Sequence, residues 1–174
     1  MSIYLKAKHW QLFIVLVGSM FLTQFIMFNT AMAGDSVNTV LLTLPALLIG
    51  ILFFGWLWSI SSACSKALPA DLASSPRPMQ VGLVYALTYF IISSVLFFGP
   101  GNQPPAYVVV MHFLAMAAIL YAMGFTAKQL TKLDQGKDIS FYSYSGPFFL
   151  FWFFPIGIWF IQPKVNQLLG TKNA

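Results

Sequence analysis

Long apolar runs separated by short polar segments dominate the pattern along this chain of 174 residues. Four runs, at about residues 10–32, 40–61, 81–98 and 107–127, are each near the length that a helix needs to cross a bilayer. No connection between them is long enough to form a soluble domain. We therefore predict an all-α integral membrane protein, with residues 1–174 forming a single membrane domain that has four transmembrane helices.

The last apolar stretch, residues 147–161, differs from the other four because it is short and carries eight aromatic residues in fifteen. A straight helix of this length would reach only about 22 Å, whereas the hydrocarbon core of a bilayer is about 30 Å thick. Because Pro155 and Gly157 interrupt the stretch, we predict a short C-terminal aromatic re-entrant or hairpin segment that bends at these two residues. A tilted fifth span with local thinning of the bilayer is the alternative.

Composition agrees with a membrane protein, since 59% of the residues are hydrophobic and 7% are charged. The nine Lys and Arg residues lie before the first run, between the second and third, and after the fourth, and the loops 33–39 and 99–106 hold none. The positive-inside rule then places the N-terminus in the cytoplasm, and also the C-terminus if residues 147–161 do not cross. Such scattered cations indicate topology and a lipid bilayer partner, with no nucleic-acid partner.

Two further features concern the polar segments. The connection after the fourth run should begin as an extension of that helix and break at Gly136. Small residues before Ala33 leave open a cleavage by signal peptidase after that residue, although the apolar run that precedes it is long enough to favour a retained anchor.

Acidic residues are scarce, because the chain has no Glu and its four Asp residues fall in the predicted connections. Proton-coupled pumps commonly use a carboxylate inside the membrane, so this mechanism is disfavoured. A phosphate-binding glycine loop, a metalloprotease helix and a serine nucleophile elbow are all absent from the sequence. Cys64 is the single cysteine, which excludes a metal site made of several cysteines. From these absences together we predict no enzyme activity, no cofactor and no metal site.

The polar side chains inside the predicted spans are the remaining candidates for function. Gln24 and Asn29 lie in the first span and His112 lies in the fourth. Each side chain can bridge two helices by hydrogen bonding, and each can instead line the path of a substrate. His112 also has the chemistry of a metal ligand or a proton-sensitive gate.

Three sequence blocks, Lys8–Phe13, Met111–Met116 and above all Gly146–Asn166, resemble a family of small bacterial multi-pass inner-membrane proteins whose activity is unknown. The resemblance implies location and architecture and transfers no catalytic or binding residue. It draws attention to residues that follow the aromatic stretch, where they would cap it, contact a partner or simply mark the exit of a helix. The candidate partner-contact segment comprises Trp152, Pro155, Gly157, Trp159, Gln162, Pro163 and Asn166.

Two classes of function follow from these patterns. The first is an accessory or structural subunit of the bacterial inner membrane that docks a membrane-protein partner through its aromatic C-terminal segment. The second is a homo-oligomeric channel or a carrier of an uncharged solute, with Gln24, Asn29, His112 or the terminal segment near the pathway.

Overall fold

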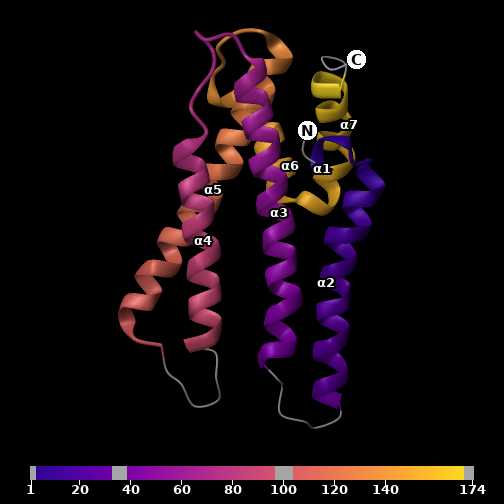
Figure 1. Ribbon diagram of the computed structural model, residues 1–174, viewed down its shortest axis with the longest axis vertical. Coiled ribbons are helices and arrows are strands. Elements are labelled where there is room, and N and C mark those ends of the chain that lie inside the picture. Colours follow the sequence, from indigo (N-terminus) through magenta and orange to yellow (C-terminus); the bar gives the residue numbers. More distant parts are fainter. Residues whose placement is uncertain (1–2, 33–38, 97–103, 171–174) are drawn as a thin grey trace.

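The computed structural model describes residues 3–32, 39–96 and 104–170, and within these ranges the chain forms helices and no strands (Figure 1). The all-α prediction is therefore confirmed for the described residues. The helices are α1 (Ile3–Lys6), α2 (His9–Met32), α3 (Thr39–Ala67), α4 (Arg77–Leu96), α5 (Ala106–Gln135), α6 (Phe141–Trp152) and α7 (Phe154–Gly170).

Three of the described helices are long and apolar enough to cross a membrane, over His9–Thr30, Leu44–Ala67 and Ala106–Gln135. Helix α4, which covers most of the predicted third span, is not among them. Its 20 residues include Arg77, Pro78 and Gln80 in the first turn, which lower its hydropathy. The predicted span also includes the apolar residues 97–98, which lie outside the described residues, as does Ala33, after which the sequence leaves cleavage open as an alternative.

Two helices continue beyond the apolar runs that predicted them. Helix α3 ends at Ala67 and α5 ends at Gln135, so the predicted extension of the last long span is confirmed. Helix α5 stops where Gly136 adopts a left-handed conformation with a φ of 66°, and its amide donates to the Lys132 carbonyl. This is a common C-terminal cap of a helix. Glycine adopts the left-handed conformation at little steric cost because it has no Cβ.

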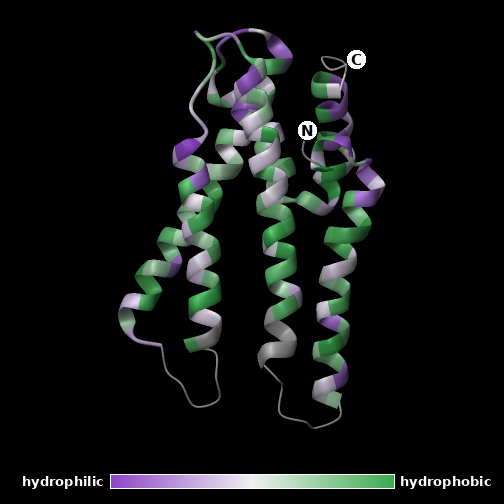
Figure 2. Ribbon diagram, in the orientation of Figure 1, coloured by the Kyte–Doolittle hydropathy of each residue, from purple (hydrophilic) through white to green (hydrophobic). Residues whose placement is uncertain are grey.

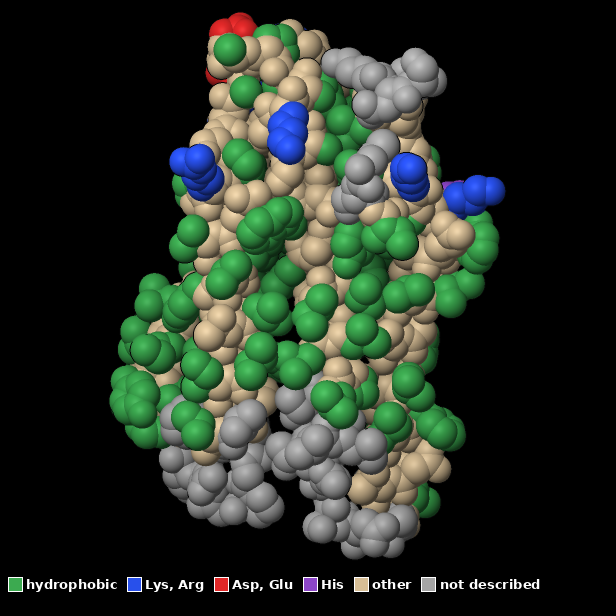
Figure 3. Space-filling view, in the orientation of Figure 1, with side chains coloured by type: hydrophobic (Ala, Val, Ile, Leu, Met, Phe, Trp, Pro, Cys, Tyr) green, Lys and Arg blue, Asp and Glu red, His purple; other side chains and the backbone are tan. Residues whose placement is uncertain are grey.

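Positive charge gathers at one end of the molecule, which we call the basic end. The α3–α4 and α5–α6 connections meet there, with the described ends of α1 and α7 nearby (Figure 1). Most of the polar stretches lie in the same half (Figure 2), and so do the visible Lys and Arg side chains (Figure 3). The described cations all belong to elements that meet in this half, namely Lys6, Lys8, Lys66, Arg77, Lys128, Lys132, Lys137 and Lys164.

Helices α6 and α7 form a hairpin. Helix α6 runs from the basic end to about the middle of the molecule, the chain reverses at Phe153, and α7 returns (Figure 1). The bend therefore precedes the residues predicted to make it. Pro155 occupies the first turn of α7, where a missing amide removes no helical hydrogen bond. Gly157 instead allows α7 to approach the Leu150 carbonyl of α6 closely.

Helix α7 continues to Gly170, well past the predicted aromatic segment. Gln162, Pro163 and Asn166 therefore lie inside a helix, and the expectation that they cap the segment or mark its exit is wrong. The expectation assumed that Pro163 ends the helix. Pro163 is instead the tenth residue of α7, and the helix continues through this internal proline to Gly170.

The hairpin contacts two pairs of helices at the basic end, namely α2 with α3 and α4 with α5. Helix α6 packs on α5, and α7 packs on α1 and α2. The fully buried Trp56 of α3 contacts Phe151 of α6, with ring centroids 5.2 Å apart. Described core residues of α2 lie only between Leu12 and Val17, whereas its second half has none. The half with the hairpin is thus closely packed, and the opposite half is more open.

Replacing Gly157 by alanine tests the close approach within the hairpin. An added Cβ would overlap the Leu150 carbonyl oxygen, which is backbone and cannot rotate away. We expect Gly157→Ala to lower the free energy of unfolding in detergent by about 3 kcal/mol or more. Gly146→Ala is the control, because a Cβ on Gly146 meets nothing within 4 Å. Equal stability of the two variants would contradict this packing.

Candidate functional site

A cavity of about 490 Å³ lies beyond the turn of the hairpin, in the half of the molecule away from the basic end. Helices α2, α3, α4 and α5 form its walls, and Phe154 at the start of α7 borders it toward the hairpin. The lining is mostly apolar. Its polar members are Thr23, Gln24, Tyr89, Ser93 and His112. This size and this mixture of surfaces are typical of sites that bind small organic molecules.

Two of the predicted candidates, Gln24 and His112, meet at this cavity from helices α2 and α5. Both side chains are exposed, so the cavity opens to the surroundings of the molecule. Neither side chain forms a hydrogen bond with another described residue. The His112 ring lies 5.9 Å from the Tyr89 ring, measured between centroids. The amide and the imidazole are thus free to donate and accept hydrogen bonds within one cavity.

The hydroxyl groups of the cavity, in contrast, are already engaged with the backbone. Each donates to a carbonyl oxygen, which leaves lone pairs as its remaining capacity. The pairs are Thr23 with Ser19 at 2.9 Å, Ser93 with Phe90 at 3.1 Å, and Tyr89 with Val108 at 3.4 Å. The Tyr89 bond joins α4 to α5 and so fixes the wall that carries His112.

Asn29 is separate from this pair. It lies on the same helix as Gln24 but does not line the cavity, and its amide donates to the Phe25 carbonyl at 2.8 Å. The structure therefore brings together two of the three predicted polar residues and leaves Asn29 bonded to its own helix.

Gln162 occupies a different place, at the centre of a buried hydrogen-bond cluster near the basic end. Its Oε1 accepts from the indole Nε1 of Trp56 at 2.8 Å. Its Nε2 contacts the carbonyl oxygens of Tyr4 at 2.8 Å and Ala7 at 3.0 Å. These carbonyls lie where the chain breaks between α1 and α2, and carbonyls at a helix end lack partners within the helix.

Asn166 completes the cluster one helical turn further on. Its Nδ2 donates to the Ala7 carbonyl at 3.1 Å, and its Oδ1 accepts from Gln162 at 2.9 Å. We call Tyr4, Ala7, Trp56, Gln162 and Asn166 the Gln162 cluster. Through it, α7 holds the N-terminal helices and α3 together.

The predicted partner-contact segment is thus divided between interior and surface. Gln162 is fully buried and bonded within the chain, whereas Trp152 and Trp159 are 45% and 46% exposed. The Trp159 ring also contacts the His9 ring, with centroids 4.7 Å apart and a tilt of 52° between the ring planes. A partner would meet the exposed rings, and this role stays a prediction.

Ion pairs at the basic end fix the connections around the hairpin. Lys164 of α7 pairs with Asp134 of α5 at 2.7 Å. Lys132 pairs with Asp138 at 2.8 Å and donates to the Leu72 carbonyl at 3.3 Å, so it links the α5–α6 and α3–α4 connections. The hydrogen bond from Lys132 holds the pKa of the Asp138 carboxyl below its usual value.

Comparison with known protein families, curated proteins and solved structures finds no match for this chain. The resemblance of its C-terminal block to bacterial inner-membrane proteins therefore stays a prediction. In the part of the chain that the structure describes, no group of three or more His, Cys, Asp or Glu residues is placed to hold a metal ion.

Sequence reasoning missed Tyr89 and Trp56. Each is an ordinary aromatic residue in an apolar run, and only the packing of its helix gives it a role. The Gln162–Asn166 spacing of four residues was a usable signal, because it places two amides on one face of a helix.

The Gln162 cluster predicts a strong effect of one substitution. Gln162→Met keeps the length of the side chain but removes the acceptor of the Trp56 indole and the amide donor to the Tyr4 carbonyl. We expect the free energy of unfolding to fall by at least about 2 kcal/mol, measured by thermal or denaturant unfolding in detergent. Gln135→Met, at the exposed end of α5, is the control and should stay close to the parent. A similar small effect for both variants would refute the role of the cluster.

Proposed function

We propose that this protein spans the bacterial inner membrane four times, through α2, α3, α4 and α5, with both termini in the cytoplasm. The cations at the basic end support this orientation. Helix α6 has 12 residues and a length of about 18 Å, which is too short to cross about 30 Å of hydrocarbon. The hairpin then enters from the cytoplasmic side and returns. Its buried contacts with the other helices are what such a segment needs.

Within this placement, we infer that the protein binds a small uncharged molecule with an apolar body and a hydrogen-bonding group. The observation that carries this proposal is the meeting of Gln24 and His112, both without hydrogen-bond partners among the described residues, at one cavity. An amide or imidazole without a partner is costly in hydrocarbon, and a ligand with a carbonyl or hydroxyl group would relieve that cost.

The charge of the ligand follows from the lining. No Lys, Arg, Asp or Glu is among the described residues that line the cavity, so a charged group would lose its hydration without gaining a counter-ion from them. A neutral lipid-like molecule or another uncharged solute fits this surface. The role we propose is binding or carriage of such a molecule, with no catalytic step.

A docking function is the second candidate, and the exposed aromatic side chains at the tip of the hairpin favour it. Trp152 and Phe153 are 45% and 58% exposed. Aromatic residues often anchor protein–protein contacts, so this tip suits an accessory subunit that holds a membrane partner.

Chemical labelling tests the membrane placement. In a variant with Cys64→Ser, we would introduce single cysteines by Lys137→Cys, Gln167→Cys and Pro104→Cys, all at exposed positions. A membrane-impermeant thiol reagent added outside intact cells should label position 104 and leave positions 137 and 167 unlabelled until the cells are opened. Labelling of position 167 from outside would show that the hairpin crosses.

The content of the cavity is tested by mild detergent extraction, removal of bound neutral lipids with organic solvent and mass spectrometry. We expect Gln24→Leu and His112→Leu each to lower the retained amount of one neutral species about tenfold, the effect of losing one good hydrogen bond at the upper end of its range. Asn29→Leu is the matched control, because Asn29 lies on α2 outside the cavity.

The same preparation separates the two candidate functions. Equal retention in all four proteins would overturn the ligand proposal. A foreign subunit that stays bound to the parent and is lost in Trp152→Ala would instead support docking by the hairpin tip.

A further inference from the structure

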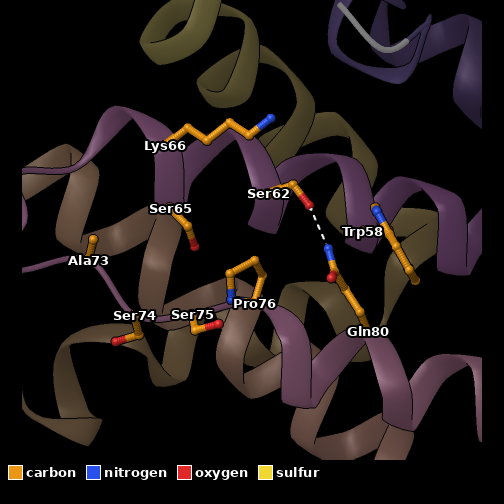
Figure 4. Close-up of a pocket in the computed structure, with 9 residues that line it drawn as sticks. All are labelled: Trp58, Ser62, Ser65, Lys66, Ala73, Ser74, Ser75, Pro76 and Gln80. Atoms are coloured by element: carbon orange, nitrogen blue, oxygen red, sulfur yellow. Dashed lines mark hydrogen bonds between the residues drawn. The ribbon is translucent and has the colours of Figure 1, made fainter.

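A second cavity of about 490 Å³ lies near the basic end and is unrelated to the proposed ligand site. It is bounded by the C-terminal half of α3, the connection to α4 and the start of α4 (Figure 4). We call it the serine cleft. Its polar lining consists of Ser62, Ser65, Lys66, Ser74, Ser75 and Gln80.

Ser65 is the distinctive member of the serine cleft. Its hydroxyl oxygen is buried and has no hydrogen-bond partner. Neighbouring serines differ, since Ser61 donates to the Trp58 carbonyl at 3.1 Å and Ser62 accepts from Gln80 at 3.0 Å. Figure 4 shows the Ser65 hydroxyl pointing from α3 into the cleft, toward Pro76. A buried hydroxyl without a partner is costly, so a bound polar group at this point would be favourable.

The charge of the cleft favours an anion. Lys66 lines it, Arg77 follows directly after the lining residue Pro76, and no Asp or Glu is among its lining residues. Asp71 lies on the same connection but does not line the cleft. The backbone amides at the start of α4 contribute little to anion binding. The Arg77 amide already donates to the Ser75 hydroxyl at 3.4 Å, and the next residue is a proline, which has no amide hydrogen. The donors inside the cleft are thus hydroxyl groups, and Lys66 adds positive charge from the outer side of α3 (Figure 4).

We propose that the serine cleft binds a phosphate group, and that its source is the headgroup of an anionic phospholipid. Hydroxyl and ammonium donors are suited to phosphate oxygens. Val81 and Val84, which follow Gln80 on α4, are 68% and 54% exposed, and they offer an apolar surface on this helix for an acyl chain. Cations beside a membrane span attract anionic lipids in the same way. The lipid source uses the proposed membrane placement, whereas the phosphate site does not depend on it or on the first cavity.

Binding measurements on the full chain in a neutral detergent test the proposal. The probes are a short-chain phosphatidylglycerol, the matching phosphatidylcholine, and inorganic phosphate, each titrated by calorimetry. The variant Ser65→Ala removes a hydroxyl donor, and Lys66→Gln removes the positive charge next to the cleft. Ser143→Ala and Lys137→Gln make the same chemical changes at exposed positions outside the cleft. The unfolding midpoint of each protein is measured without a probe.

We expect phosphatidylglycerol to bind more tightly than phosphatidylcholine, and its Kd to rise about tenfold in Ser65→Ala and in Lys66→Gln but not in the controls. Without a probe, Ser65→Ala should unfold at the same temperature as the parent or higher, because the substitution removes a buried hydroxyl that has no partner. If Ser65 had only a structural role, its substitution would not weaken phosphatidylglycerol binding while leaving the unfolding midpoint unchanged.

Each other outcome is decisive. Equal Kd values in the parent and the cleft variants, or equal affinity for the two lipids, would overturn the anion site. Inorganic phosphate that competes as well as phosphatidylglycerol, with the same dependence on Ser65 and Lys66, would keep the phosphate site and overturn the lipid source.

Discussion

The buried amide of Gln162 is the interaction on which the arrangement of this protein depends. A break between α1 and α2 leaves carbonyl groups facing the interior, and unpaired carbonyls there would be costly. Gln162 contacts two of them and also accepts a hydrogen bond from Trp56. One side chain thus fixes α7 against α1, α3 and the connection between α1 and α2. Because α6 is joined to α7 by the turn at Phe153, the cluster also orients α6 and thus the whole hairpin.

The position of the hairpin explains why the molecule has two different halves. Where α6 and α7 lie between the helix pairs, the core is closely packed around Trp56 and Phe151. Beyond Phe153 nothing from the hairpin separates the pairs, and the cavity with Gln24 and His112 lies there. Because Phe154 borders this cavity, a change in the hairpin would also alter the proposed ligand site. Stability and binding are therefore linked through the same short segment.

Local patterns predicted the features that depend on a few neighbouring residues. Apolar runs located α2, α3 and α5, and Gly136 marked the end of α5, because span length and helix capping act locally. The bend was misplaced because proline both ends helices and begins them, and only packing against α6 shows that Pro155 begins one. The Gln162 cluster and the shared cavity of Gln24 and His112 could not be predicted, since each joins helices far apart in the sequence.

The length of chain between the partners in the Gln162 cluster has a consequence for biosynthesis. Tyr4 and Gln162 are 158 residues apart. At the usual rates of translation, the N-terminal carbonyl is made roughly ten seconds or more before the amide that binds it. During this interval the start of the chain lacks its contact with Gln162. Helix α7 thus fixes the position of α1 only after most of the chain has been made.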